Sequence, residues 1–335
     1  MPKILLTGAY GEIFRAPVAA LLPADWQIDS WEPALGEGGL AAKSADAEVI
    51  IPSAEYAYSG WVQSSLATAR HLRLIHAPFS GMEWLQREWL PPGCAACNSD
   101  VHASAIAEFV ILGILEMTIG MRRMDAELRQ GRWTWGGSTV IGRKHREVKG
   151  RTIGIVGYGR IGREVAARAS AFGMQIVAVS RHPSRQPGDP LLWWRGMHAL
   201  DELLACADFV VLACPLNEHT RGLVDARRLA VMKRDAVLVN VARGPVVVEA
   251  ALYAALRDRS IGGAVLDVWY DYPTPSAPIG HPSRNFAFHE LDNAIITPHC
   301  SGWTEELQQR RIQAVLDNLA RHLRGEPPAN VWLQG

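Results

Sequence analysis

Residues 151–162 read Arg-Thr-Ile-Gly-Ile-Val-Gly-Tyr-Gly-Arg-Ile-Gly, and this stretch decides the fold of the larger part of the chain. An apolar run that predicts a buried strand is followed by Gly157, Gly159 and Gly162 in the spacing GxGxxG, and a helical pattern runs from Arg163 to Phe172. A strand, a glycine-rich turn and a helix in this order form the context in which the motif binds a dinucleotide. The three glycines permit the tight turn, the approach of the pyrophosphate and the packing of the helix on the strand. We expect the phosphates to lie at the helix N-terminus.

The end of the next strand, over residues 174–180, is the second determinant of the cofactor. An acidic residue at this position holds the ribose 2′-OH of NAD. Here the position is Ser180, followed by Arg181 and, nearby, Arg185. A serine and guanidinium groups suit a 2′-phosphate better, because arginine binds phosphate through paired hydrogen bonds. The sequence therefore favours NADP(H), and NAD(H) stays possible if Arg181 only stacks on the adenine.

Outward from this motif, strand and helix patterns alternate along most of the chain. Apolar runs that predict strands lie at residues 3–8, 47–53, 72–79, 151–157, 174–180, 208–213, 236–242, 262–269 and 293–299. Helical patterns lie at residues 16–22, 61–69, 103–124, 163–172, 202–207, 227–232, 251–258 and 304–324. Such alternation is typical of parallel sheets covered by helices.

We therefore expect an α/β protein of two doubly wound parallel-sheet domains. The larger, over residues 101–299, is expected to be a Rossmann dinucleotide-binding domain. Residues 1–100 together with 300–335 are expected to form a flavodoxin-like substrate domain, to which the amphipathic helix at 304–324 returns. A long loop without periodicity, rich in proline, is expected from Tyr272 to Phe288, and loops of this length are often functional.

The helix expected from Ala103 to Met124 is apolar almost all round. Glu108 and Glu116 interrupt its apolar stretch, which favours a buried helix over a membrane span. Such a surface requires burial on two sides, in a domain core or at a subunit interface. We expect a homodimer, because this helix is too apolar to remain exposed.

Composition excludes several classes of function. Lys+Arg and Asp+Glu both number 34, so the net charge is zero and general affinity for nucleic acid or anionic membrane is not expected. The five cysteines do not resemble a secreted disulfide framework. Cys94 and Cys97 have zinc or redox spacing, but no second pair completes a site, so no metal is expected. The glycine-interrupted N-terminal segment does not resemble a signal peptide, and we expect a cytoplasmic protein.

Three further segments follow the dinucleotide motif in order. They are Asn-Val-Ala-Arg-Gly-Pro at 240–245, Leu-Asp-Val-Trp at 266–269 and Thr-Pro-His-Cys-Ser-Gly at 297–302. With the glycine motif, they make the chain resemble the D-isomer-specific 2-hydroxyacid dehydrogenases over nearly its whole length. Asn98, Ala107-Glu108 and the segment at 214–224 match further parts of the family pattern.

The resemblance implies roles for individual residues. Arg243 would bind the substrate carboxylate and polarise the carbonyl, and His299 would exchange a proton with the substrate oxygen. Cofactor contacts are implied, by motif or family position, for Gly157, Tyr158, Gly159, Arg160, Ile161, Gly162, Ser180, Arg181, Arg185, Cys214, Pro215, Thr220, Val241, Ala242, Asp267, His299 and Gly302. Asp267 would lie near the nicotinamide carboxamide. The alternative is a structural role, in which this acid at the end of a strand caps a loop. The family's carboxylate-binding loop corresponds to Ala77–Gly81, where Phe79, Ser80 and Gly81 would contact substrate, although the loop departs from the usual glycine-rich form.

One departure from the family concerns the partner of the histidine. The family places a glutamate five residues after the aspartate of the LDV motif, whereas this chain has Tyr272. We take Tyr272 as a third catalytic residue, with Asp271 as a substitute only if the loop twists by one residue. A phenol stabilises an imidazolium less than a carboxylate does. We expect a lower pH optimum for reduction or a weaker proton-transfer step.

The function implied is NAD(P)H-dependent reduction of a small 2-oxo acid, such as glyoxylate or hydroxypyruvate, to the D-2-hydroxy acid. A substituted dyad also occurs in formate-oxidising relatives. A cofactor-sensing interaction module without turnover is the alternative from another class, and the presence of both Arg243 and His299 speaks against it. Five aromatic residues could line a pocket for a larger substrate, or could belong instead to the core or to an interface. They are Trp133, Trp135, Trp269, Tyr270 and Trp303.

Overall fold

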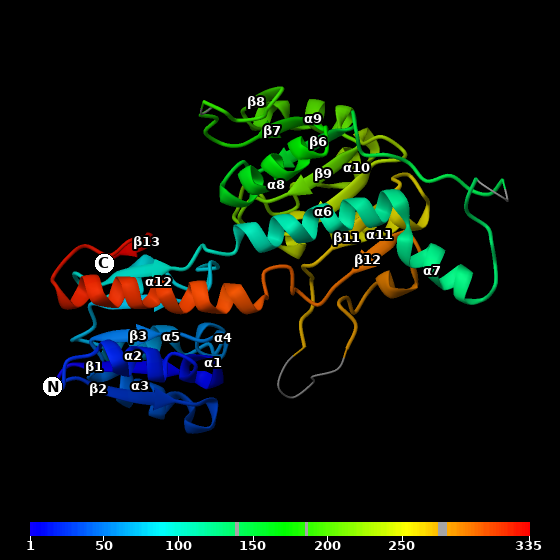
Figure 1. Cartoon of the computed structure of the whole chain (residues 1–335). Helices are drawn as coiled ribbons and strands as arrows, with labels where there is room; N and C mark the ends of the chain where they lie inside the picture. The colour runs from blue at the N-terminus through cyan, green and yellow to red at the C-terminus, as the bar shows by residue number, and fades with distance from the viewer. Residues whose placement is uncertain (138–140, 185–186, 274–279) are drawn as a thin grey trace. The chain divides into compact units, whose positions relative to one another are not determined.

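The structure is a computed structural model that describes residues 1–137, 141–184, 187–273 and 280–335. It divides into two compact units, Ala103–Trp303 and Met1–His102 with Thr304–Gly335. Each unit contains one sheet, and both sheets are covered by helices (Figure 1). The expected α/β fold class with two doubly wound sheets is confirmed.

The larger unit contains a seven-stranded sheet in the order β12-β11-β10-β9-β6-β7-β8, and all its strand pairs are parallel. The strands are β6 (Thr152–Val156), β7 (Gln175–Val179), β8 (Trp193–Arg195), β9 (Phe209–Leu212), β10 (Val237–Asn240), β11 (Gly263–Leu266) and β12 (Ala294–Ile296). The strand order reverses between β6 and β9. In open parallel sheets, ligands bind at such a switch point, beyond the carboxyl ends of the strands.

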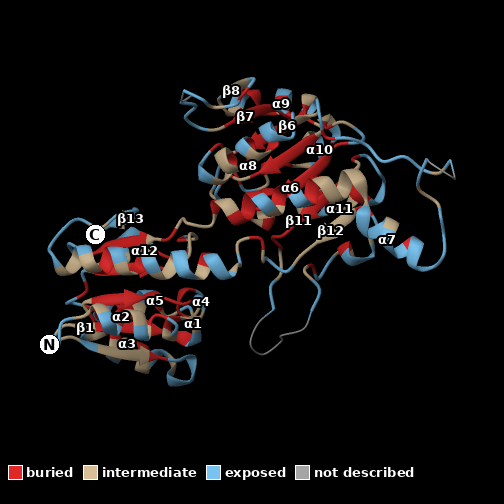
Figure 2. Cartoon of the chain, in the orientation of Figure 1, coloured by how far each residue is buried: buried red, intermediate tan, exposed pale blue. Residues whose placement is uncertain are grey.

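Two hydrophobic clusters cover the two faces of this sheet. Helices α6 (Ala103–Ile119) and α8 (Arg160–Ala171) pack on one face, and α9 (Leu200–Cys206), α10 (Ala226–Val231) and α11 (Glu249–Arg257) pack on the other. Alternate residues of one strand enter different clusters, as Phe209 and Val210 of β9 do. The inner strands are therefore buried on both faces (Figure 2), which explains their continuous apolar runs.

The prediction of one long helix from Ala103 to Met124 is wrong, because this segment contains two helices. α6 ends at Ile119, and α7 (Met121–Arg129) continues after a bend of 53°. Gly120 between them has a φ of 75°, a left-handed conformation that glycine adopts without strain. In the described part of this chain, Leu112 of α6 remains 63% exposed, so part of the apolar surface of the helix is left uncovered. Among the described residues, no single helix is long and apolar enough to span a membrane; only the bent α6–α7 pair meets that criterion together.

The smaller unit contains a six-stranded sheet in the order β13-β5-β4-β3-β1-β2. Its strands are β1 (Lys3–Thr7), β2 (Gln27–Trp31), β3 (Val49–Ile51), β4 (Leu74–Ala77), β5 (Ala95–Asn98) and β13 (Val331–Gln334). All pairs are parallel except β13 with β5. Without β13, the order is that of flavodoxin-like sheets.

Helices also cover this sheet. They are α1 (Gly8–Glu12), α2 (Arg15–Leu21), α3 (Gly36–Ala45), α4 (Ala54–Ala57), α5 (Val62–Thr68) and α12 (Glu305–Leu323). Thr304 caps α12 by accepting a hydrogen bond from the Leu307 N–H. Val315 and Leu319 of α12 are buried in the same cluster as Ile4 and Leu6 of β1. The last long helix therefore belongs to the core of the unit formed by the start of the chain.

Cys94 and Cys97 pack in separate hydrophobic clusters of the smaller unit. They do not form a ligand pair, because an odd separation along extended chain turns two side chains to opposite faces. Burial raises the pKa of each thiol to about 12. The two cysteines are therefore neutral core residues.

Candidate active site

The glycine-rich turn between β6 and α8 has the geometry that a dinucleotide requires. Gly157 has a φ of 96°, and a Cβ there would lie 2.7 Å from the Ala213 carbonyl oxygen. A Cβ on Gly162 would lie 2.5 Å from the Gly157 oxygen. Gly159 differs, because a Cβ on it would meet no atom within 4 Å. The open space therefore lies at the glycine that the pyrophosphate approaches, at the N-terminus of a twelve-residue helix. These residues fit a bound dinucleotide.

Three side chains of the motif differ in their exposure. Arg160 is exposed and Ile161 is half-buried at the start of α8. Tyr158 is 4% exposed and packs on Trp194, with ring centroids 4.8 Å apart. Any contact between Tyr158 and a cofactor therefore falls to its backbone.

Ser180 follows the end of β7, and its side chain is already oriented. The Trp194 Nε1–H donates a hydrogen bond of 2.8 Å to the Ser180 Oγ. One lone pair of the hydroxyl is thus occupied, which leaves its O–H available as a donor. Arg181 is exposed beside it, and Arg185 lies outside the described residues. Asp189 accepts hydrogen bonds from Arg163 (2.5 Å) and Tyr158 (3.3 Å).

The loop after β9 is closed by Thr220. Its Oγ1 donates to the Pro215 carbonyl at 2.6 Å and accepts from the Asn217 N–H at 2.8 Å. Cys214 is buried, which raises the pKa of its thiol to about 11. The Gly157 turn lies against the backbone at residues 213–214. The predicted cofactor residues that follow β6 and β9 therefore lie next to each other, at the point between these strands where the strand order reverses.

Arg243 is held by the loop after β10. The Asn240 side chain donates to the Arg243 carbonyl and accepts from the Ala242 N–H, both at 3.1 Å. Val241 and Ala242 are buried beneath this turn. A Cβ on Gly244 would lie 2.3 Å from the Trp269 carbonyl oxygen, so only glycine allows the loop to pack against the loop after β11. Asn240 and Gly244 thus fix the base of the Arg243 side chain.

His299 lies on a tight turn after β12, and Asp267 holds that turn. The Asp267 Oδ1 accepts from the Thr297 hydroxyl (2.7 Å) and the Cys300 N–H (2.8 Å), and its Oδ2 accepts from the Ser301 N–H (2.9 Å). Asp267 has no exposed surface. These contacts agree with the alternative role of Asp267, in which an acid at the end of a strand holds a loop. Gly302, also expected at the cofactor site, is half-buried next to this turn.

Tyr272 is the hydrogen-bond partner of the His299 ring. Its Oη lies 3.0 Å from the His299 Nδ1 and accepts the Trp269 N–H at 3.1 Å. Asp271 instead accepts the Arg284 N–H at 2.9 Å and pairs with its guanidinium at 3.1 Å. The structure thus brings the phenol, and not the neighbouring carboxylate, to the histidine.

The charges around His299 favour its neutral form. Although the residue keeps exposed surface, partial burial lowers the pKa of His299, the positive charge of Arg243 lowers it further, and the negative charge of Asp267 opposes both. Arg243 follows β10 and His299 follows β12, and the charge of the arginine reaches the ring. A cation and a proton-exchanging ring are what a developing alkoxide requires.

The segment expected to bind the substrate carboxylate lies in the smaller unit. Phe79, Ser80 and Gly81 follow β4 and are half-buried. The Asn98 side chain donates a 2.8 Å hydrogen bond to the Ser80 carbonyl. Phe79 packs on Trp84, with centroids 6.4 Å apart. The loop is therefore fixed at the carboxyl end of its sheet.

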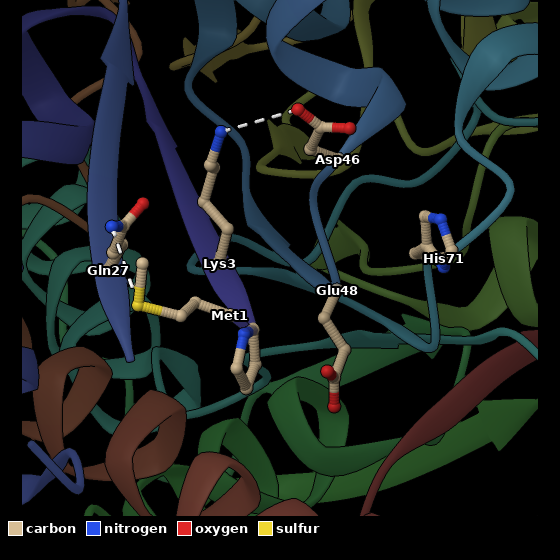
Figure 3. A pocket seen from close by; sticks show the side chains of 7 residues that line it. Met1, Lys3, Gln27, Asp46, Glu48 and His71 are labelled. Atoms are coloured by element: carbon tan, nitrogen blue, oxygen red, sulfur yellow. Dashed lines mark hydrogen bonds and ion pairs between the residues drawn. The ribbon is translucent and has the colours of Figure 1, made fainter. Parts of the chain in front are cut away.

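A separate hollow of about 500 Å³ lies at the opposite end of the same sheet. Figure 3 shows Lys3 and Asp46, 3.7 Å apart, beside Gln27, Glu48 and His71. These residues begin or precede β1 to β4, so the hollow lies at the amino ends of the strands. Ligands in such folds bind at the carboxyl ends. We therefore do not assign the hollow to the active site.

Several residues that hold the site were missed by sequence reasoning. They are Asn240, Gly244 and Trp194, together with the Trp269 backbone N–H. Asn240 and Gly244 lie within the motif at 240–245, so a search for turn-forming residues beside Arg243 finds them. Nothing in the sequence indicates that Trp194 contacts Ser180.

The fold and the site define an NAD(P)-dependent oxidoreductase of the two-domain α/β type. Residues 111–301 match the family model described as D-isomer specific 2-hydroxyacid dehydrogenase, NAD binding domain. A glyoxylate reductase of Pyrococcus furiosus is 31% identical over 98% of this chain and 94% of its own length. An (S)-sulfolactate dehydrogenase of Chromohalobacter salexigens is 37% identical over 65% of this chain and 66% of its own.

Solved structures agree. A 2-hydroxyacid dehydrogenase of Xanthobacter autotrophicus Py2, in complex with NADPH and MES, has a TM-score of 0.76 and 25% identity, over 98% of this chain and 97% of the other. A family member from Aeromonas salmonicida has a TM-score of 0.79 and 24% identity, over 98% of both chains, which shows the fold. The chain belongs to the D-isomer-specific 2-hydroxyacid dehydrogenase family.

Proposed function

We propose that the protein reduces a small 2-oxo acid of the glyoxylate or hydroxypyruvate type to the D-2-hydroxy acid. The observation that carries this proposal is that the charge of Arg243 acts on the His299 ring, while Asp267, Gly244 and Trp269 hold the loops after β10, β11 and β12 against one another. Arg243 binds the carboxylate and polarises the carbonyl, and His299 supplies the proton. The bound nicotinamide supplies the hydride.

The larger unit holds the cofactor, and the predicted carboxylate-binding residues Phe79, Ser80 and Gly81 belong to the smaller unit. The turn from Gly157 to Gly162, with the backbone of Tyr158 and the loop at Cys214, holds the dinucleotide. The Ser180 O–H and the Arg181 guanidinium favour NADPH over NADH, because both donate to a 2′-phosphate. The NADPH complex of the Xanthobacter dehydrogenase supports this choice of cofactor, and the similarity to a glyoxylate reductase of Pyrococcus furiosus supports a small 2-oxo acid as substrate.

The test is the loss of reduced-nicotinamide absorbance with glyoxylate, hydroxypyruvate, pyruvate and phenylpyruvate, each with NADPH and with NADH. We expect turnover of a small 2-oxo acid with a preference for NADPH. His299→Asn is expected to lower kcat about 10²- to 10⁴-fold, as the loss of a general acid does. Tight cofactor binding without turnover of any 2-oxo acid would instead indicate a cofactor-sensing module.

We also propose that the protein is a homodimer. Leu112 of α6, Met121 and Leu128 of α7, and Trp133 are all at least half exposed. Together they give the α6–α7 side of the larger unit an apolar surface that a second copy would cover. Light scattering tests this, and a monodisperse monomer would contradict it.

A further inference from the structure

Two hydrogen bonds join the residue that follows β7 to the neighbouring strand β8. The Trp194 Nε1–H donates to the Ser180 Oγ at 2.8 Å, and the Ser180 N–H donates to the Arg195 carbonyl at 3.1 Å. Ser180 occupies the position that determines cofactor choice in dinucleotide-binding domains. Both the side chain and the backbone of this serine are therefore held by β8.

The indole of Trp194 is held by a cluster that reaches the glycine-rich turn. Its ring packs on Tyr158, with centroids 4.8 Å apart, and the Arg163 guanidinium lies over both rings, 5.0 Å from the tyrosine and 5.4 Å from the tryptophan. Arg163 in turn pairs with Asp189 at 2.5 Å. Tyr158 lies between the first two glycines of the GxGxxG motif. The turn expected to approach the pyrophosphate and the strand end expected to approach the ribose thus share one packed cluster.

The indole determines which way the serine hydroxyl points. An indole N–H only donates, so it occupies one lone pair of the Ser180 Oγ, and the hydroxyl hydrogen must point away from Trp194. A hydrogen bond that an oxygen accepts also polarises its O–H and strengthens it as a donor. The oxygens of a 2′-phosphate accept hydrogen bonds, whereas a free 2′-OH both donates and accepts. An oriented O–H therefore benefits a 2′-phosphate more than a free ribose.

We propose that Trp194 is a positioning residue for cofactor selection, which makes the Ser180 hydroxyl a fixed donor for the 2′-phosphate of NADPH. This inference rests on the cofactor choice in the proposed function. Arg181 adds positive charge beside the serine, but its side chain is exposed, and the attraction of an exposed charge is screened by salt. The pair of Ser180 and Trp194 supplies the direction that a charge alone lacks.

The first test is calorimetric titration of the full-length protein, without substrate, with NADPH and with NADH, which differ only in the 2′-phosphate. Trp194→Phe keeps an aromatic ring against Tyr158 and removes the N–H. We expect it to weaken NADPH binding about fivefold and to leave NADH binding within about twofold of the wild type. Equal weakening of both cofactors would show a merely structural role and overturn the proposal.

Ser180→Ala tests the same pair from the other side. We expect NADPH binding to weaken about tenfold, because a hydrogen bond to a charged group is lost, and NADH binding to change much less. This variant leaves Trp194 in place, so an unchanged ratio of the two dissociation constants would refute the proposal even if Trp194→Phe does not fold.

The double variant separates positioning from packing. With no hydroxyl to orient, Trp194→Phe should change the affinity of Ser180→Ala for either cofactor by less than about twofold. A further fivefold loss of NADPH affinity would mean that the indole acts by another route, which contradicts the proposal. Trp193→Phe is the matched control. This neighbouring tryptophan of β8 packs against the Arg195 guanidinium, 4.7 Å from its ring centroid, and the variant should keep the wild-type ratio.

These measurements use no 2-oxo acid, so they do not depend on turnover. Wild-type protein that binds NADPH no more tightly than NADH would overturn both the cofactor choice and the role of Trp194, and would leave the reductase function to its own assay. A preference for NADPH that Trp194→Phe reduces, in a protein that reduces no 2-oxo acid, would support the role of Trp194 and refute the reductase function alone.

Discussion

His299 has a φ of 57°, a left-handed conformation that is rare outside glycine. Such strain costs about 1–3 kcal/mol and persists only where the surroundings enforce it. Three hydrogen bonds from the turn to the buried Asp267 carboxylate enforce it here. At the residue scale, the position of the histidine therefore depends on a side chain that is not itself exposed.

Asp267→Asn should weaken this turn. An amide presents N–H groups to neighbours that are themselves mostly donors, so at least one hydrogen bond is lost. We expect about 1–3 kcal/mol less stability and a kcat for reduction lower by about tenfold or more. Urea unfolding and steady-state kinetics measure both effects. Asp258→Asn, at a surface pair with Arg257, should change neither. An unchanged kcat in Asp267→Asn would contradict the holding role.

At the scale of elements, the site consists of loops that follow neighbouring parallel strands. The loops after β10 and β11 approach so closely that a Cβ on Gly244 would lie 2.3 Å from the Trp269 carbonyl oxygen. The Trp269 loop in turn carries the N–H that orients Tyr272 and an indole that donates to the Thr297 carbonyl at 2.7 Å. The three loops therefore form one packed layer.

Gly244→Ala should disturb all three loops, because the added methyl group meets backbone rather than a flexible side chain. We expect a loss of about 1–3 kcal/mol in stability and a drop of about 10²-fold in kcat/KM. Thermal unfolding and kinetics test this. Gly38→Ala is the control, since a Cβ there meets nothing within 4 Å and alanine favours the helix α3. Equal behaviour of the two variants would refute the packed-layer account.

The elements that the sequence predicts well are those with continuous apolar runs, such as β6 and β9 to β11. β2, β5, β8 and β13 were not predicted, because QIDSW and VWLQ carry polar residues at sheet edges and AACN and WWR are short. The break at Gly120 was missed because an apolar pattern continues up to it. In the site, the motifs located Arg243 and His299, but whether Tyr272 or Asp271 reaches the ring depends on loop geometry that no local pattern determines.

At the scale of the whole molecule, His76 links three parts of the smaller unit. Its ring lies 3.1 Å from the Ser99 hydroxyl and 3.2 Å from the Asn318 amide of α12. Burial lowers the pKa of His76 to about 4. The folded unit therefore holds the neutral ring, and protonation favours the unfolded chain.

Stability should consequently be complete above a pH of about 6.5 and fall as the pH drops toward 4, by about 3 kcal/mol at the lower value. The urea midpoint at pH 7.5 and at 5 measures the effect. His76→Gln should be less stable at pH 7.5 and lose most of this dependence, whereas His219→Gln, at an exposed site, should keep it. Equal pH dependence in wild type and His76→Gln would contradict the assignment to His76.

The return of α12 and β13 to the first unit also determines the order in which the molecule can fold during synthesis. The core that contains Ile4, Phe14 and Val18 lacks Val315 and Leu319 when the first segment of the unit ends at His102. Roughly 200 residues of the larger unit must then be made before the second segment begins at Thr304. At about 5–20 residues per second, this delay is on the order of 10–40 s. The part of the chain that leaves the ribosome first is therefore completed last, and its unfinished apolar surface is where chaperones would bind the nascent chain.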